Sequence, residues 1–489
     1  MRVLLASSEV HPYSKTGGLA DMAGALGKYL ARAGVKTGIV TPLYRGTRAK
    51  FPALKASDIT FELPLGDRRV AASIWTLDPL PNLTVYFVDQ PAFFDRAEIY
   101  QEKGISYPDN ADRYIYFSKC VVRCARQLSW QPQVLHIHDW QTGLVPLLVR
   151  HAKDFDGWTH APRTCFTIHN LAYQGQFSMD TYRLTNLPWY YFTPEGVEFY
   201  GGFNCLKTGL VFTDLITTVS PRYAREITTE AFGCGLDGLL RARQNALFGI
   251  LNGVDYSEWN TEHNPHLRHA FSVENLEGKR AGKLALQQEY GLPQRADVPL
   301  FGTISRLADQ KGMDLELAAL EEMIGNEIQF VLLGTGDPMF ESAFAGLAQR
   351  YPNKVAVKIG YDAGLAHRIE AGCDFFLMPS RFEPCGLNQM YSLRYGTIPI
   401  VRATGGLDDS VIDVTENADW ANGIKFYDYS AAALVKAMHK ALVIYADAEL
   451  LKHYRLNAME ADFSWERTAQ EYQSVYQRLL VGAGSGAQP

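Results

Sequence analysis

Residues 14–21 read Ser14-Lys15-Thr16-Gly17-Gly18-Leu19-Ala20-Asp21, and the rest of the chain can be placed around this stretch. Before it, residues 2–7 form a short apolar run that predicts a buried strand. After it, apolar residues recur at helical spacing and predict a helix with one apolar face: Leu19, Met22, Leu26, Tyr29 and Leu30. A strand, a glycine turn and a helix make half of a nucleotide-binding βαβ unit.

This turn has two interpretations. Gly17 and Gly18 would let the backbone approach a ligand, and the helix start would offer N–H groups to an anion. Lys15 would add a mobile positive charge at the same place. A tight structural turn would need the same glycines and no ligand, so the stretch alone leaves both interpretations open.

Length and composition narrow the class of protein. A chain of 489 residues is too long for one ordinary core and predicts two or three domains. The net charge of −6, without long basic runs, argues against nucleic acid or an anionic membrane as a partner. Seven cysteines without a CxxC pair indicate free thiols in a reducing compartment. We expect a cytoplasmic protein, or one in a plastid stroma, that is a monomer or weak homo-oligomer.

Strands and helices alternate along both halves of the chain. This order predicts an α/β fold of two doubly wound, Rossmann-like domains that face each other across a cleft. The predicted domains are residues 1–252 and 253–462, with turn residues and a polar stretch at their boundary. An amphipathic helix over 463–480 is expected to cross back to the first domain, and 481–489 is expected to be a flexible tail. Short alternating runs within 51–89 predict an antiparallel insertion.

Polar residues follow two predicted strands of the first domain. The strand 134–138 is followed by Asp139, and the strand 163–168 by His169 and Asn170. Open α/β sheets bind their ligands at the carboxyl ends of the strands, so these side chains are candidates for a binding site.

Three patterns invite a metal interpretation, and each has a plainer alternative. His136 and His138 alternate on one strand, but His136 lies deep in an apolar run and is predicted to belong to the core. Cys120 and Cys124 are four residues apart on a predicted helix, without a histidine on that face, and are expected to be buried thiols. The motif Asp154-Phe155-Asp156 has a form used by some transferases, but its polar surroundings favour a solvated loop.

In the second half, Arg306 and Lys311 follow a predicted strand over 299–305. Two cations at a strand end suit a diphosphate and could take the place of a metal ion. As part of a solvated loop they would need no ligand.

Glu383 precedes a helix that is predicted to start near Cys385-Gly386-Leu387. The helix start could hold a phosphate and leave the carboxylate to face a sugar hydroxyl or a positive anomeric carbon. Complementing the helix dipole is the plainer interpretation. Thr404-Gly405-Gly406 is a second glycine turn after a strand and is equally ambiguous.

Taken together, the motifs resemble those of bacterial glycogen synthases and plant starch synthases, which are glucosyltransferases of the GT-B architecture. The resemblance covers nearly the whole chain. The stretches that carry it, in order, are SEVHPYSKTGGLAD, YPDNADRY, HIHDWQTG, TIHNLAYQG, TTVSPRYAREI, GILNGVD, ISRLADQKG, LMPSRFEPCGLNQ and VRATGGL.

The resemblance implies a retaining transfer of glucose from ADP-glucose, or UDP-glucose in some members, to the non-reducing end of an α-1,4-glucan, without a metal or other cofactor. Lys15 and Gly18 would lie at the diphosphate and donor glucose. The remaining catalytic candidates would be Asp139 and His169 on the donor sugar, Arg306 and Lys311 on the phosphates, and Glu383 near the reacting carbon. Tyr361 matches the residue that stacks on adenine. Further substrate-binding candidates are Gly17, Asp21, Asn170, Asn252, Cys385, Gly386, Leu387, Thr404, Gly405 and Gly406.

Glu383 is the one carboxylate found near the reacting carbon, so we favour front-face attack, in which the leaving phosphate helps to deprotonate the acceptor hydroxyl, over double displacement. Asp408-Asp409 departs from the family pattern, which has a less acidic pair there. Three rival classes are a UDP-glucose enzyme with a small acceptor such as fructose phosphate, a non-catalytic glucan-binding protein and a dinucleotide oxidoreductase. The last would need G-x-G-x-x-G after the first strand, which the chain lacks.

Overall fold

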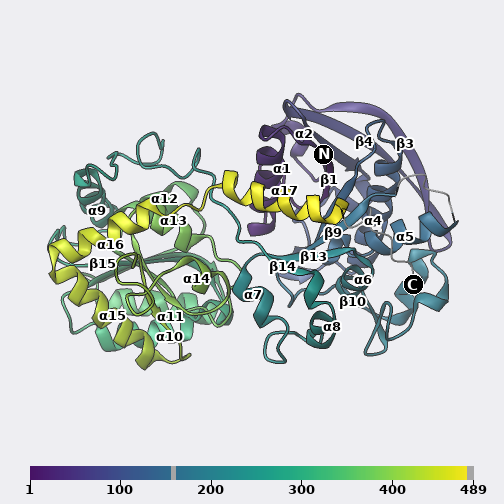
Figure 1. Ribbon diagram of the computed structural model, residues 1–489. Coiled ribbons are helices and arrows are strands. Elements are labelled where there is room, and N and C mark those ends of the chain that lie inside the picture. The colour runs from purple at the N-terminus through teal and green to yellow at the C-terminus, as the bar shows by residue number, and fades with distance from the viewer. Residues whose placement is uncertain (156–160, 482–489) are drawn as a thin grey trace. The chain divides into compact units, whose positions relative to one another are not determined.

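The computed structural model of the protein describes residues 1–155 and 161–481. These residues cluster into two compact units, each built on a sheet (Figure 1). The first unit holds residues 1–219, 224–250 and the C-terminal helix from residue 465, and the second holds 220–223 and 251–464. The predicted boundary at residue 252 lies just after this division, and the predicted tail beyond Val481 lies outside the described residues.

The main sheet of the first unit has the order β14-β13-β9-β8-β1-β2-β5-β4-β3. Pairs from β14 to β5 are parallel, and the pairs of β4 with β5 and with β3 are antiparallel. The strands of this sheet are β1 Arg2–Ala6, β2 Lys36–Pro42, β3 Lys55–Leu65, β4 Arg68–Leu80, β5 Leu83–Asp89, β8 Val134–His138, β9 Arg163–Ile168, β13 Leu215–Thr218 and β14 Leu247–Gly249.

The predicted antiparallel insertion is observed, because β3 pairs with β4 and β4 pairs with β5 in antiparallel order, but β5 also has a parallel partner. Strand β5 pairs in parallel with β2, so it belongs to the doubly wound part of the sheet. It lies between β2 and β4 and is buried along most of its length, whereas β3 at the edge alternates between exposed and less exposed residues.

Helices and small strands complete the first unit. The helices are α1 Gly18–Arg32, α2 Thr47–Lys50, α3 Pro91–Phe94, α4 Asn110–Gln127, α5 Val145–Phe155, α6 Cys205–Phe212, α8 Asp237–Ala242 and α17 Trp465–Val481. Helix α7 Pro221–Glu226 begins in the second unit and ends in the first. Short 3₁₀ turns are η1 Trp140–Thr142, η2 Met179–Thr185, η3 Trp189–Tyr191 and η4 Gln244–Ala246. Small strands are β6 Gln101–Glu102, β7 Ile105–Ser106, β10 Gln176–Phe177, β11 Glu198–Phe199 and β12 Gly202–Asn204.

The C-terminal helix α17 is part of the first unit's core. Trp465, Tyr472 and Tyr476 are buried in one apolar cluster with Val3 and Leu5 of β1. Figure 1 shows α17, in yellow, beside α1 at the N-terminal end of the chain, and residues of the two helices are in contact. The apolar face predicted for α1 is buried in the same cluster, which confirms that prediction.

The second unit has a fully parallel sheet in the order β17-β16-β15-β18-β19-β20. Its strands are β15 Leu300–Leu307, β16 Gln329–Gly336, β17 Val355–Ile359, β18 Phe375–Met378, β19 Ile398–Arg402 and β20 Ile424–Phe426. Its helices are α9 Glu277–Glu289, α10 Met313–Met323, α11 Pro338–Arg350, α12 Ala363–Gly372, α13 Asn388–Arg394, α14 Gly405–Ser410, α15 Ala431–Ala446 and α16 Ala448–Glu460, with the 3₁₀ turn η5 Asp309–Lys311.

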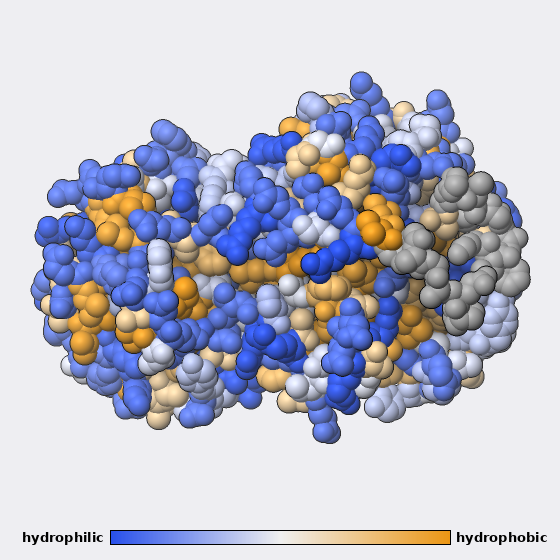
Figure 2. All heavy atoms as spheres, viewed as in Figure 1, coloured by the Kyte–Doolittle hydropathy of each residue, from blue (hydrophilic) through white to orange (hydrophobic). Residues whose placement is uncertain are grey.

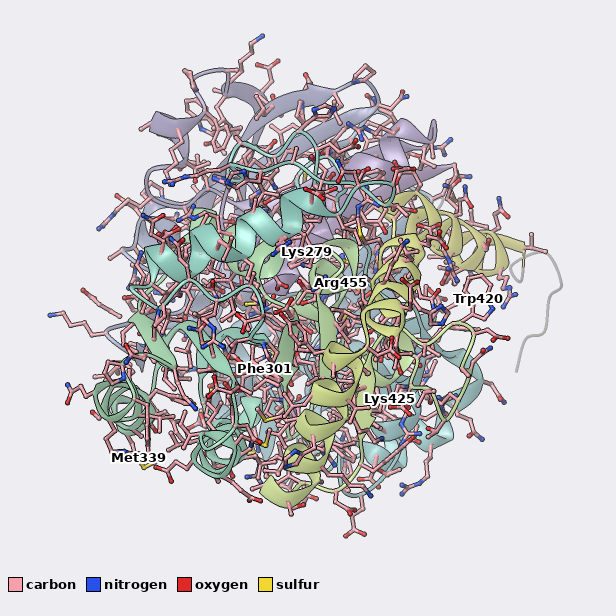
Figure 3. The ribbon with its side chains drawn as sticks, turned by 90° about the vertical axis from the view of Figure 1, so that its left-hand side faces the viewer. Lys279, Phe301, Met339, Trp420, Lys425 and Arg455 are labelled. Carbon is pink, nitrogen blue, oxygen red and sulfur yellow. The ribbon has the colours of Figure 1, made fainter. Side chains whose placement is uncertain are left out.

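Apolar side chains cover both faces of this second sheet. Phe301 and Leu332 pack on one face with α10, α11 and α15, while Leu300 and Leu333 pack on the other with α9 and α12. In Figure 3, Phe301 lies inside the unit and the exposed Met339 lies at its outside. Successive residues of a strand point to opposite faces, so a run of apolar residues predicts this double covering, as observed.

In both units the strand order reverses beside the first strand. The chain proceeds from β1 through β2 to β5 and then returns to β8 on the other side of β1. In the second unit it proceeds from β15 through β16 to β17 and then returns to β18. In open α/β sheets the crevice for a ligand lies at the carboxyl ends of the strands at this switch point.

Hydrophilic residues, in blue, cover most of the face seen in Figure 2, and apolar residues form separate patches on it. Among the described residues, no helix combines the length and the apolar character that a membrane crossing needs.

Candidate active site

The switch point of the first unit gathers the candidates that follow β1, β8 and β9. These strands are parallel neighbours, so their carboxyl ends meet at one edge of the sheet. The turn at residues 15–18 follows β1, Asp139 follows β8 directly, and His169 follows β9 directly. The topology therefore brings together three stretches that the sequence singled out one by one.

The turn before α1 is tied to a buried carboxylate that the sequence analysis did not assign. Glu9 is buried and accepts hydrogen bonds from the Thr16 N–H, from the Thr16 hydroxyl at 2.7 Å and from the Gly17 N–H at 3.3 Å. Lys15 donates to the Asp21 carboxylate at 2.7 Å and remains partly exposed. Two N–H groups that the sequence suggested for an anion are thus already satisfied by the protein.

Asp139 lies in a strained position at the end of β8. Its φ of 55° and ψ of −177° are rare for any residue except glycine, and such strain is typical of functional sites. Its carboxylate accepts the His169 N–H at 2.8 Å and also the backbone N–H of Asn170. Burial raises the pKa of Asp139 to about 7, these two hydrogen bonds oppose the rise, and the negative charge of Glu9 adds to it.

Three histidines with tilted rings lie in contact next to Asp139. The rings of His136 and His138 lie 4.2 Å apart, and His138 Nδ1 lies 3.1 Å from His169 Nε2. Burial lowers the pKa of His136 and of His169 to about 3 and that of His138 well below its usual value, so all three are neutral at neutral pH.

The prediction that His136 is a core histidine is confirmed. It is fully buried, and its two ring nitrogens contact the Thr167 hydroxyl at 2.6 Å and the Tyr476 hydroxyl at 2.7 Å.

The surroundings of His138 indicate which nitrogen carries its proton. His138 Nε2 is buried and has no hydrogen-bond partner among residues 1–155 and 161–481. A buried donor without an acceptor is rarer than a buried acceptor without a donor. This favours a proton on His138 Nδ1, donated to His169 Nε2. His169 then carries its own proton on Nδ1 and can donate it to another group.

The switch point of the second unit holds an ion pair between two predicted residues. Lys311, which follows β15, donates to Glu383 Oε2 at 2.7 Å, and the Ser380 hydroxyl donates to the same oxygen at 3.0 Å. Glu383 is 6% exposed, whereas Arg306 at the end of β15 is exposed. In the part of the chain that the structure describes, no carboxylate pairs with Arg306. This edge therefore presents one unpaired cation, one paired cation and one carboxylate.

The helix predicted to start near Cys385-Gly386-Leu387 is present, but it starts slightly later, with Leu387 as its N-cap. Helix α13 begins at Asn388 and is only seven residues long, and Cys385, Gly386 and Leu387 lie in the turn before it. Gly386 has a φ of 70°, a left-handed conformation that cannot belong to the helix. Side chains fix this turn instead, because the Gln389 amide donates to the Cys385 and Gly386 carbonyls.

The Thr404-Gly405-Gly406 turn packs against the backbone around Glu383. The Gly406 N–H donates to the Glu383 carbonyl at 3.1 Å. A Cβ on Gly405 would lie 1.9 Å from that same carbonyl oxygen, and a Cβ on Gly406 would lie 1.9 Å from the Cys385 oxygen. Both glycines are therefore needed to hold Glu383 in place.

The remaining candidates are at different places. Burial raises the pKa of the Cys385 thiol to about 12, although the thiol accepts the Asn252 N–H, so Cys385 is a neutral packing residue. Asn252 Oδ1 is buried and unpaired within the described residues. Asn170 caps its own turn, since its side chain accepts the Ala172 N–H. Tyr361, after β17, is 83% exposed and separate from the ion pair.

Asp408 and Asp409, the departure from the family pattern, are held by the Lys425 side chain and by a backbone N–H, respectively. The buried Lys425 donates to Asp408 at 3.0 Å and to Glu416 at 2.9 Å, and Figure 3 shows its position in the second unit. The Arg222 N–H donates to Asp409 at 2.7 Å. This acidic pair has a structural explanation and needs no ligand.

The two metal patterns that lie on described side chains, His136 with His138 and Cys120 with Cys124, do not form a metal site. Cys120 and Cys124 are buried free thiols, as predicted. Helix α5 ends at Phe155, so the motif Asp154-Phe155-Asp156 falls outside the residues whose side chains the structure describes. Across the described ranges, no three His, Cys, Asp or Glu side chains are arranged to hold a metal ion.

Comparisons with known proteins agree with this geometry. The starch synthase catalytic domain family matches residues 2–242, and the glycosyl transferases group 1 family matches residues 289–459. A glycogen synthase of Anaeromyxobacter sp. is 48% identical over 98% of this chain and 100% of its own length. Glycogen synthase 2 of Nitrosococcus oceani is 44% identical over 98% of this chain and 97% of its own.

Solved structures give the same result. The catalytic domain of starch synthase IV from Arabidopsis thaliana, bound to ADP and acarbose, superposes with a TM-score of 0.88 at 34% identity, covering 98% of this chain and 99% of that one. A sucrose-phosphate synthase from Thermosynechococcus elongatus superposes with a TM-score of 0.60 at 17% identity, with the same coverage, and shows a shared fold only.

Proposed function

This chain belongs to the glycogen and starch synthase family of GT-B glucosyltransferases, and we propose that its donor is ADP-glucose and that it retains the anomeric configuration. The acceptor is the non-reducing end of an α-1,4-glucan, and no metal takes part. The ADP and acarbose in the Arabidopsis structure support a donor that contains ADP.

The observation that carries this proposal is the Lys311–Glu383 ion pair beside the exposed Arg306. Breaking the bond between glucose C1 and the phosphate oxygen leaves its electron pair on the diphosphate. Two cations at the strand end stabilise that charge as it develops, which a metal ion would otherwise do. The Glu383 carboxylate stabilises the positive charge that develops on the sugar.

The first unit supplies polar groups for the donor sugar. Asp139 and His169 lie at the carboxyl ends of the neighbouring strands β8 and β9, held to each other by the hydrogen bond from the His169 N–H to Asp139. His169 Nδ1 can donate to a sugar hydroxyl, and the Asp139 carboxylate can accept from one. Lys15 adds a positive charge near these groups. That both units hold one donor molecule remains a prediction of the sequence.

The environment of Glu383 favours front-face attack over double displacement. Glu383 Oε2 already accepts from Lys311 and from the Ser380 hydroxyl, and both contacts weaken its oxygen as a nucleophile. In front-face attack, the acceptor hydroxyl oxygen forms the new bond to C1 while its proton moves to the departing phosphate oxygen. A covalent glucosyl adduct on Glu383, trapped and identified by mass spectrometry, would refute this mechanism.

The decisive experiment incubates the protein with radiolabelled ADP-glucose and glycogen. We expect label in the polymer with EDTA present, and a loss of about a thousandfold in kcat for Glu383→Ala and Lys311→Ala. Competition with UDP-glucose tests the donor, and fructose phosphate tests a small acceptor. Wild-type protein that labels neither acceptor from either donor would overturn the proposal.

A further inference from the structure

Glu9 is a buried charge that the proposed reaction does not use. It is 3% exposed and receives hydrogen bonds from the Thr16 N–H and hydroxyl, the Gly17 N–H and the Tyr100 hydroxyl, the last at 2.7 Å. A buried carboxylate is costly unless it is well bonded, so four donors on one group mark a built arrangement. All of them come from the turn before α1 or from the loop that carries Tyr100.

The direction of each bond can be assigned. A carboxylate only accepts, so Tyr100 spends its single proton on Glu9. The Ser8 hydroxyl, 2.7 Å from the Tyr100 oxygen, therefore donates to Tyr100. Ser8, Tyr100 and Glu9 form one chain of bonds that ends on Thr16 and Gly17.

This chain of bonds divides the N–H groups at the helix start. The first N–H groups of a helix have no partner within the helix and attract anions. Glu9 takes those of Thr16 and Gly17. The N–H groups of Gly18 and Leu19 donate to no acceptor within residues 1–155 and 161–481, so they remain available to a ligand.

A second contact fixes the same loop on the helix. The His11 N–H donates to the Ala20 carbonyl at 3.0 Å, and a Cβ on Gly24 would lie 2.3 Å from the His11 oxygen. The loop from Glu9 to Thr16 is therefore pressed against α1 at two points. Lys15 directly precedes Thr16, which is bound to Glu9, and its side chain pairs with Asp21.

We propose that Glu9 is a positioning residue for the donor: by holding Thr16 and Gly17, it presents Lys15 and the N–H groups of Gly18 and Leu19 to the bound nucleotide sugar. This inference rests on the proposed function. It assigns no contact between Glu9 and the substrate. The negative charge of Glu9 also raises the pKa of Asp139, so Glu9 acts electrostatically on one of the two residues proposed to bind the donor sugar.

The test measures steady-state kinetics of Glu9→Ala, with the KM of ADP-glucose and of glycogen determined separately. We expect the donor KM to rise by about tenfold or more, because the turn loses its pre-arranged geometry, while the glycogen KM stays within about twofold. In Glu9→Gln the amide oxygen can accept both N–H groups and its NH₂ can donate to the two hydroxyls, so the donor KM should return to within about threefold of wild type. Tyr100→Phe removes one donor and should give an intermediate value.

The chain offers a matched control at the amino ends of other strands in the same sheet. Asp214 accepts the Thr164 N–H at 2.7 Å and the Thr164 hydroxyl at 2.9 Å, the same two kinds of bond that Glu9 makes with Thr16. Asp214→Ala should lower the unfolding temperature as Glu9→Ala does, and leave the donor KM unchanged.

Each outcome separates this inference from the function it rests on. If wild type is active and Glu9→Ala lowers only the unfolding temperature, as Asp214→Ala does, Glu9 is merely structural and the inference is wrong. If Glu9→Ala does not fold, a donor KM for Tyr100→Phe equal to that of wild type overturns the inference instead. If wild type neither transfers glucose nor binds ADP-glucose in calorimetry, the proposed function fails first and the inference falls with it.

Discussion

Two glycine turns in this molecule look alike in sequence and differ in what requires them. Gly17, before α1, has an extended backbone with a φ of −157°, and a Cβ there would meet no atom within 4 Å. Gly405, the first residue of α14, has a φ of 47°, and a Cβ there would lie 1.9 Å from the Glu383 carbonyl oxygen. Packing within the protein therefore requires a glycine at position 405 and does not require one at position 17.

The charges beside the two turns differ in the same way. Asp21 pairs with Lys15, whose side chain is 41% exposed, and Asp408 pairs with Lys425, whose side chain is 3% exposed. The turn in the second unit is therefore part of a packed core, and the turn in the first unit keeps room and charge at the surface. The open space beside Gly17 suits the proposed ligand, whereas the backbone oxygen beside Gly405 shows that the fold itself requires that glycine.

The largest effect is expected for Gly405→Ala. The new methyl group would collide with the Glu383 carbonyl, and the positive φ adds backbone strain, so we expect a loss of more than about 4 kcal/mol of stability. Urea unfolding measures it. Gly346→Ala, in α11 with only Arg350 near it, is the control and should stabilise by about 1 kcal/mol. An unfolding midpoint of Gly405→Ala equal to that of wild type would show that packing does not require a glycine at this position.

The next effect is the pH dependence that Asp139 gives to the stability of the first unit. The pKa of Asp139 is raised to about 7 in the folded protein. Between the lower pKa of Asp139 in the unfolded chain and pH 7, the folded state therefore holds a proton on Asp139 that the unfolded state has lost. The free energy of unfolding falls as the pH rises through this window. Asp139→Asn stays neutral and escapes this loss. The unfolding free energy of Asp139→Asn minus that of wild type should therefore increase by up to about 4 kcal/mol from pH 4 to pH 8. Thermal unfolding at both pH values checks this, and a constant difference would contradict it.

A third effect separates the two lysines. Lys425→Met leaves Asp408 and Glu416 without their shared donor and should cost about 2 to 3 kcal/mol. Lys15→Met breaks an exposed pair and should cost less than about 1 kcal/mol, while donor turnover is lost. Unfolding curves and the transfer assay on the same preparations distinguish the two. Equal destabilisation by both variants would remove the contrast between the units.

The smallest stability effect is expected for Gly17→Ala. An extended backbone accepts alanine and the space is open, so the unfolding free energy should change by less than about 1 kcal/mol. The methyl group would occupy the surface offered to the donor, and the KM of ADP-glucose should rise. A stable variant with wild-type kinetics would show that the space beside Gly17 is unused.

The sequence predicted the parts of the fold that rest on apolar runs. The buried strands of both sheets and the apolar face of α1 follow directly from hydrophobic patterns. Helix α9 was missed, because Lys279, Lys283 and Gln287 are buried on it and disguise its apolar face. Lys279, marked in Figure 3, donates to the carbonyls of Ala371 and Tyr395, so its burial depends on distant partners that no local pattern reveals. Helices α15 and α16 and the short strands β14 and β20 were also missed.

For the site, the residue types and the strand ends were predictable and the bonds between them were not. Lys311 and Glu383 were both singled out, but their ion pair joins residues 72 positions apart and depends on β15 and β18 being neighbours. Glu9 was overlooked because a single glutamate near a strand end has no distinctive pattern. Its role emerges only when Thr16, Gly17 and Tyr100 are seen to converge on it.

The C-terminal helix α17 has a consequence for how the protein is made. Residues 465–481 are synthesised after the whole second unit, although Trp465, Tyr472 and Tyr476 belong to the core of the first unit. The nascent first unit must wait, with the α1 face uncovered and His136 lacking the Tyr476 hydroxyl, while the whole second unit is synthesised. The first unit is synthesised first, but its core can be completed only after the second unit has been made. A stop codon before residue 465 would therefore leave the core of the first unit incomplete.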